Sequence, residues 1–179
     1  MLDAQLQALV QAQLVAGLAA RGITAAVKQN NQPRQFAAPS TPTVFHTLGP
    51  RKKYGWPQAS DKLNSDGVTL TTTTTQVVQT RFQIAALVPN ASPANPMAMT
   101  SGDIASVAAD ILQHENAIAA FVAAGCNVFR VSDNPAVPFI DSNGQTVWWA
   151  SFDIIFAHKD VFTTSTGAVS SIVSNVNRL

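Results

Sequence analysis

The fold is decided by residues 68–89, which read VTLTTTTTQVVQTRFQIAALVP. From residue 78 onward, apolar and polar side chains largely alternate, and the polar row includes Gln79, Arg81 and Gln83. A repeat of two places the two rows on opposite faces of an extended strand. Strands usually run for about five or six residues, and this stretch is far longer. We therefore predict a long strand that lies half in a sheet and half, around residues 71–75, beyond it.

The chain is poor in charge. Its 179 residues include 11 basic and 10 acidic side chains, so only 12% are charged and the net charge is +1. About a quarter is usual in soluble domains. A balance near zero gives no sign of a nucleic-acid or membrane-surface binder. Two explanations stay open: much of the surface contacts other proteins, because interface cores are depleted in charge, or the source has Ala-rich proteins.

Neither export nor membrane insertion is predicted. The single Cys126 excludes an internal disulfide and a cysteine zinc cluster, and we expect it to be a small buried side chain at a strand start. No run approaches the roughly 18 apolar residues of a membrane span. The N-terminus lacks the basic segment of a signal peptide. We expect the chain to fold in a reducing cytoplasm.

Two helices flank the central strand in the sequence. The first is predicted from leucines and Val10 at three- and four-residue spacing, and it ends near Gly22. The second begins at a capping box formed by Thr100 and Asp103. Its apolar stripe predicts a single long helix that stops at Gly125.

A hairpin is predicted around the central strand. Residues 43–48 alternate and predict a strand, which Gly49-Pro50 breaks or bends. Residues 59–67 are polar and read as a loop. With the central strand, these segments predict a β-hairpin with a long tip. The proline-containing stretches 28–42 and 90–99 read as an extended excursion and a loop.

The C-terminal third adds further strands. Residues 126–131 predict a short strand, and residues 137–140, which include a proline, predict at most an edge strand. Residues 141–144, with their Asn-Gly pair, predict a turn. Residues 145–159 alternate and predict a second long strand, whose apolar face packs with that of the Phe82 strand.

Together these segments predict an α+β fold, because the strands and helices do not alternate as βαβ units. We expect a mainly antiparallel sheet of about four to five strands, with two helices packed on one face and a long projecting β-hairpin. We assign residues 1–160 to a single domain and residues 161–179 to a C-terminal arm or marginal strand.

A basic and aromatic excursion follows the first predicted strand. It contains Arg51, Lys52, Lys53, Tyr54 and Trp56. Such a mixture could grip single-stranded nucleic acid, and aromatic and arginine side chains are also preferred anchors of protein interfaces. We favour the protein interface, because no second basic patch extends the footprint.

No catalytic, cofactor-binding or metal-ligating residue is predicted. The three histidines, His46, His114 and His158, lie outside metal-ligand spacing of each other and of Cys126. We expect His158 to be a partly buried structural residue. Phosphate-binding loops, nucleophile elbows and zinc-protease motifs are absent from the sequence. A site assembled by folding stays open, although no motif supports one.

Several segments in combination resemble the phage neck and tail-terminator proteins. They are an N-terminal amphipathic helix followed by stretches that read KKYGWPQ, QVVQTRFQIAALVP, SGDIASVAADILQHENAIAAFVAAG and SFDIIFAH. The resemblance covers most of residues 1–159. It implies that the domain of residues 1–160 assembles into a ring, usually a hexamer, that caps the tail tube and joins it to the head or neck.

The resemblance also implies the partners. These are other copies of the chain, the tail tube protein and neck or portal-adaptor proteins, with DNA only passing through the lumen without sequence-specific binding. It implies no cofactor, no membrane contact, and a place in the virion at the junction of neck and tail after assembly in the host cytoplasm. Our candidates for subunit or axial contacts are Arg51, Lys52, Lys53, Tyr54, Trp56, Thr71, Thr73 and Thr75.

Two alternatives stay open. Within the structural class, the chain could be a head-completion or portal-adaptor ring protein. From another class, it could be a small sugar-binding or enzymatic module that uses Trp56, Trp148 and Trp149 as stacking platforms. Trp148 and Trp149 have opposite parity on one strand, so at most one faces a ligand, and this weakens the binding-module reading.

Overall fold

The computed structural model describes residues 3–29, 41–88, 99–140 and 146–167. These residues form three helices and one five-stranded sheet with the strand order β1-β2-β3-β5-β4. The elements are α1 (Asp3–Ala20), β1 (Ala26–Gln29), β2 (Thr43–Leu63), β3 (Thr69–Leu87), α2 (Ser101–Gln113), α3 (Glu115–Ala123), β4 (Cys126–Ile140) and β5 (Thr146–Gly167).

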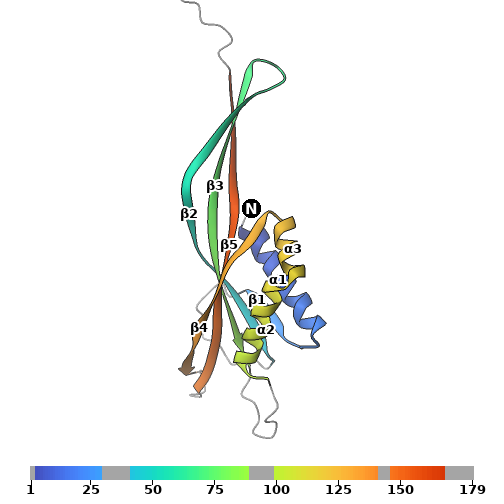
Figure 1. Cartoon of the computed structure of the whole chain (residues 1–179). Coiled ribbons are helices and arrows are strands. Elements are labelled where there is room, and N and C mark those ends of the chain that lie inside the picture. The colour runs from blue at the N-terminus through green and yellow to red at the C-terminus, as the bar shows by residue number, and fades with distance from the viewer. Residues whose placement is uncertain (1–2, 30–40, 89–98, 141–145, 168–179) are drawn as a thin grey trace, which may run out of the picture.

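The helices form one layer on one face of the sheet, as Figure 1 shows. Strand β1 pairs with β2 in parallel, and the other three pairings are antiparallel. The predicted α+β class, with a mainly antiparallel sheet and helices on one face, is therefore confirmed. The four-residue strand β1 was not predicted, because four residues are too few to show a repeat.

The core lies between the helix layer and the alternate residues of the two long strands. In β3, Phe82 and Ile84 are buried, and in β5, Phe156 is buried. The Phe156 ring makes edge contacts with Phe82 at 5.6 Å and with Phe121 of α3 at 4.8 Å between ring centroids. The predicted packing of the two apolar faces is therefore confirmed, and the strands are direct neighbours in the sheet.

Helix α1 packs through four residues at four-residue spacing. They are Leu6, Val10, Leu14 and Leu18, and all are buried. The helix is followed by Gly22 with φ +69°, a left-handed conformation that suits glycine. Cys126 is fully buried at the start of β4, as predicted, and burial raises the pKa of its thiol.

The predicted single helix from residue 100 to Gly125 is wrong, because His114 divides it into α2 and α3. The backbone of His114 is extended, with φ −67° and ψ 146°. Its Nδ1 accepts a hydrogen bond from the backbone N–H of Asn116 at 3.3 Å and so caps α3. Periodicity alone does not reveal such a break. The capping box of Thr100 and Asp103 is present as predicted.

Of two predicted interruptions of β2, the bend at Gly49-Pro50 is confirmed, whereas the loop predicted at residues 59–67 is wrong for its first part. The strand continues through Gly49-Pro50, where its register against β3 shifts, so these residues bend the pairing without ending it. It also continues through residues 59–63, which were predicted as loop, so that the turn is confined to residues 64–68. Polar composition predicted the loop, but cross-strand pairing with β3 keeps this segment extended.

The last two strands are longer than predicted. The segments predicted at 126–131 and 137–140 belong to one strand, β4, at the sheet edge, with irregular register near residues 129 and 135–136. Strand β5 continues beyond residue 159 to Gly167. The predicted turn at 141–144, the stretches 30–40 and 89–98, and residues 168–179 lie outside the described residues.

A close approach between α1 and α2 predicts the effect of adding a methyl group. At Gly17, a Cβ would overlap the side chain of Ile111, with Cγ1 at 2.8 Å. Although alanine favours helix by about 1 kcal/mol, we expect Gly17→Ala to lower the free energy of unfolding by about 1–3 kcal/mol through overpacking. Urea unfolding would measure this. Gln11→Ala, on the exposed side of the same helix, is the control, and equal stabilities would contradict the packing argument.

Buried His46 predicts a pH dependence of stability. Its side chain is fully buried, neither ring nitrogen has a hydrogen-bond partner, and burial lowers its pKa. As pH falls through about 6.5, the His46 imidazole binds a proton in the unfolded chain but stays neutral in the folded chain. The free energy of unfolding therefore falls as pH drops below that value. We expect His46→Leu to flatten the dependence of Tm between pH 7.5 and 5. Parallel curves for the two proteins would contradict this role.

Candidate interaction surface

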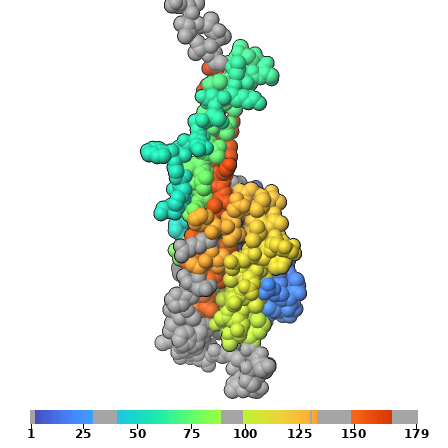
Figure 2. Space-filling model, in the orientation of Figure 1, coloured from blue at the N-terminus to red at the C-terminus, as the bar shows by residue number. Residues whose placement is uncertain are grey.

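The sheet extends well beyond the helix layer. Residues 51–63 of β2, 69–77 of β3 and 159–167 of β5 form a three-stranded extension, which we call the projection (Figures 1 and 2). At about 3.3 Å per residue its length is roughly 30 Å. The predicted projection of residues 71–75 is present, but it consists of three strands where a two-stranded hairpin was predicted. Most of the third strand comes from the segment after residue 160, which was predicted to be a C-terminal arm or marginal strand.

Strand register defines the two faces of the projection. Directly paired residues share a face, and in β3 the residues Val78 and Phe82 face the helices. We call the side with these residues the inner face and the opposite side the outer face. Of the eight predicted contact residues, five lie on the outer face: Lys52, Tyr54, Thr71, Thr73 and Thr75.

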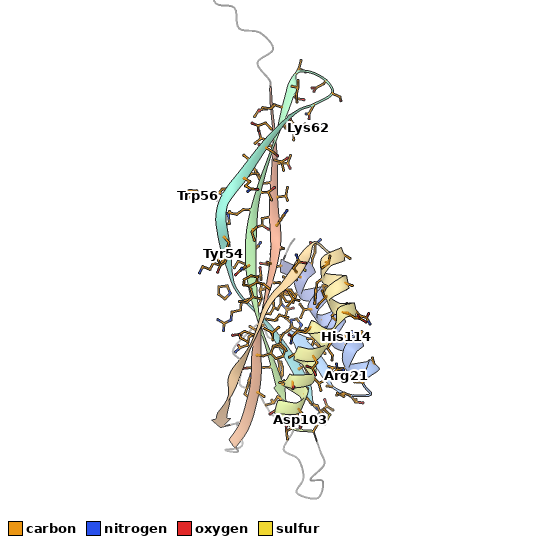
Figure 3. The ribbon with its side chains drawn as sticks, in the orientation of Figure 1. Arg21, Tyr54, Trp56, Lys62, Asp103 and His114 are labelled. Carbon is orange, nitrogen blue, oxygen red and sulfur yellow. The ribbon has the colours of Figure 1, made fainter. Side chains whose placement is uncertain are left out.

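The other three predicted residues lie elsewhere. Arg51 and Lys53 pair with Thr80 and Val78, so they are on the inner face. Trp56 lies in the register shift between Tyr54 and Gln58, is 92% exposed, and stands on the side of the projection away from the helix layer (Figure 3). The structure therefore gathers most of the predicted contact residues on one face and separates the adjacent basic residues.

Arg51 is committed to a contact inside the subunit. Its Nη2 donates to both carboxylate oxygens of Asp160 at 3.0 Å, and its Nη1 lies 3.3 Å from Asp3 of α1. This cluster ties β2 to β5 and to the first turn of α1, where the projection leaves the helix layer. Arg51 therefore fixes the base of the projection, although its side chain was predicted to contact a partner.

A buried imidazole continues this cluster into the core. His158 Nε2 lies 3.2 Å from Thr80 Oγ1, while Nδ1 is 3.6 Å from Asp160. Burial lowers the pKa of His158, and the nearby Asp160 acts in the opposite direction. The order hydroxyl, imidazole, carboxylate matches a nucleophilic triad in residue types, but the Thr80 side chain has no exposed surface and cannot reach a substrate. This group joins strands.

Hydroxyl groups of the Thr-rich run stabilise the tip. Thr71 donates to the side chain of Asn64 at 2.8 Å, and Thr72 donates to Asp61 at 2.6 Å. Asp66 accepts from the backbone N–H groups of Val68 and Thr69 at 3.0 Å, in addition to the Thr69 hydroxyl. The bonds from Thr69 and the Val68 backbone lower the pKa of Asp66. The run therefore holds the hairpin turn in one shape.

Large apolar side chains are exposed along the projection. Besides Trp56, Val161 is 61% and Phe162 is 67% exposed. A groove of about 700 Å³, whose walls include Phe162 and Lys53, runs along its base. A second groove of about 540 Å³ lies between Val77 and Lys159 of the sheet and Val122 of α3. Val161 and Phe162 were not predicted as contact residues, because their segment was predicted to be an arm or marginal strand. The one signal in the sequence was that two apolar residues are adjacent there.

Within the described residues, no three His, Cys, Asp or Glu side chains come close enough to hold a metal ion. No helix in the described part of the chain is long and apolar enough to cross a membrane.

The ion pairs at the base predict that Arg51 contributes more to stability than the neighbouring Lys53 does. We expect Arg51→Gln to lower the free energy of unfolding by about 1 kcal/mol, because the two pairs are partly exposed. Lys53→Gln is the matched control and should change stability less. Denaturant unfolding at low and at 1 M salt would test this, since screening should reduce the difference. Equal effects of both substitutions would refute the structural assignment of Arg51.

Comparison with known proteins gives one family. A family model described as E217 gateway protein gp29 matches residues 5–168. No curated protein matches the chain. The matched range includes the helix layer, the sheet and all three strands of the projection. The projection is therefore part of the family pattern.

Proposed function

This chain belongs to the E217 gateway protein gp29 family, and on that basis we propose that it forms a ring in the neck of a phage virion, where it acts as the tail terminator. The family consists of phage virion proteins, so the chain is a phage structural protein. In the proposed role the ring, a hexamer, caps the tail tube, connects it to the portal side and leaves a lumen for DNA.

The observation that carries the proposal is the projection. Two or more packed layers normally bury the apolar faces of a domain, but the projection is a single layer with large exposed side chains on both faces. Trp56, Val161 and Phe162 add nothing to the subunit's own core. Such side chains gain stability once a partner removes them from water. This supports a subunit that is completed by assembly.

Charge distribution supports the same role. A surface with few charged residues suits a protein that is largely in contact with other subunits. In the proposed ring, DNA passes without a sequence-specific grip, which agrees with a net charge of +1. The proposed function needs no catalytic centre, metal or cofactor, and its partners are other copies, the tube protein and neck proteins.

The aromatic residues do not favour the sugar-binding alternative. The Trp149 ring is stacked on Phe45, with 6.0 Å between centroids and 21° between planes. This contact occupies one face of a ring that a sugar would need. The side chain of Trp148 lies outside the described part of the chain. A portal-adaptor ring differs from the terminator only in its neighbours, and binding to tail tubes separates the two.

We expect the purified chain to form closed rings, alone or on tail tubes. Native mass spectrometry and negative-stain microscopy would measure the subunit number, with and without tubes of the cognate tube protein. A protein that stays monomeric and ignores the tubes would contradict the function. Rings that bind the portal side and ignore the tubes would favour the adaptor.

Shortening the projection tests whether ring formation depends on its outer part. Gln58 and Thr75 are directly paired, so replacing residues 59–74 with Asn-Gly closes the hairpin with a two-residue turn. We expect this variant to keep the helical circular dichroism and to lose ring formation. Intact rings in the shortened variant would show that the outer part of the projection makes no essential contact.

A further inference from the structure

We propose that the outer face of the projection docks on the helix layer of a neighbouring copy, so that subunits join head to tail. This inference rests on the proposed ring function and assigns the two surfaces that meet. It follows from how charge and apolar side chains are divided between the two surfaces.

The outer face carries lysines and no acid. Lys52 is paired with Gln79, Lys62 with Thr71, and Lys159 with Val77, which places all three on this face. Within the described residues none of the three takes part in an ion pair, and all are exposed. The two acids of the projection strands lie on the inner face, because Asp61 is paired with Thr72 and Asp160 with Gln76.

Apolar side chains lie among these lysines. Tyr54 is opposite Val77, which in turn is opposite Lys159 on the other neighbouring strand. Lys52 Nζ lies 5.3 Å from the centre of the Tyr54 ring. Tyr54, Val77 and Val161 are all exposed. Aromatic side chains such as Tyr54 are preferred anchors of protein interfaces, and the lysines around them suit the polar rim.

The helix layer has the opposite charge. The three helices contain Asp3, Asp103, Asp110 and Glu115 and no basic residue. Asp3 is used by Arg51, and Asp103 closes the cap of α2. Asp110 and Glu115 therefore remain as the exposed acids, although Asp110 also has Arg21 at 3.7 Å.

Helix α3 also presents an apolar stripe. Glu115, Ile118 and Val122 are spaced by three and four residues, so they lie along one side of the helix. Ile118 and Val122 are exposed. The side therefore combines an acid with two aliphatic residues, which complements lysines combined with Tyr54 and Val77.

Charge also excludes contacts between like surfaces. Two outer faces would bring lysines together, and two helix layers would bring acids together, which disfavours a symmetric dimer. Of these three arrangements, only the outer face against the helix layer pairs opposite charges. A contact between two different surfaces is heterologous and can close into a ring.

Interface size limits the contact. Three strands at about 4.8 Å spacing over roughly 30 Å give about 400 Å² of sheet, whereas a stable interface buries about 800 Å² on each partner. The contact must therefore continue onto the outer face of the sheet below the projection. Lysines could instead face DNA phosphates, but the exposed Tyr54, Val77 and Val161 among them are unsuited to a phosphate surface.

Charge reversal on both surfaces tests the docking. We expect Lys52→Glu to weaken ring assembly at least tenfold, measured as the protein concentration at half assembly by mass photometry in low salt. Lys53→Glu is the matched comparison, because Lys53 is the next residue of the same strand but lies on the inner face, and it should weaken assembly much less than Lys52→Glu. Lys52→Gln should have a smaller effect, and circular dichroism melts would show that each variant folds.

The rescue pairs Lys52→Glu with Glu115→Lys in one chain. Glu115→Lys alone should also weaken assembly, and the double variant should recover most of the lost affinity. Failure of the rescue, or equal effects at residues 52 and 53, would overturn the docking. If the parent protein still forms rings, the proposed function stands. A parent that never forms rings would overturn both. Unchanged rings with lost binding of a 20-base-pair duplex in Lys52→Glu would overturn the docking and assign the face to DNA.

Discussion

The structure depends on the pairing of β3 with β5, which is continuous from Thr69 to Ala86, and on its pairing with β2, whose register shifts twice along the same length. One strand is thus both a core strand and the middle of the projection. Its lower half buries Phe82 and Ile84 against the helices, and its upper half has no helix over it (Figure 1). Because the backbone hydrogen bonds continue between the two halves, the projection holds a fixed direction relative to the core, although no second layer supports it.

The change from core to projection occurs at the Arg51 cluster. There, the inner face stops packing against apolar helix residues and begins to use ion pairs, with Arg51 between Asp160 and Asp3 and with His158 against Thr80. Partly exposed ion pairs add little stability, but their geometry joins two strands and one helix at a single point. Several of the few charges are thus divided by location: internal pairs at the base, lysines on the outer face of the projection and acids on the helices.

The central strand and the fold class could be predicted because alternation over many residues reports burial directly. The extent of the projection could not, since residues 59–63 and 161–167 have no pattern of their own and become strands by pairing with β3. The break at His114 depends on one capping bond. Composition correctly marked residues 51–56 as unusual, but adjacent residues of a strand face opposite sides, and this separates Arg51 from Lys52.

In the proposed ring, a neighbouring copy completes the projection. Electron cryomicroscopy of the assembled protein would test it most directly, at a resolution that shows side chains. We expect a ring in which Tyr54 and Val77 of each subunit are buried against α3 of the next. A ring whose projections stand free in solvent on both faces, with subunits joined only through their cores, would contradict it.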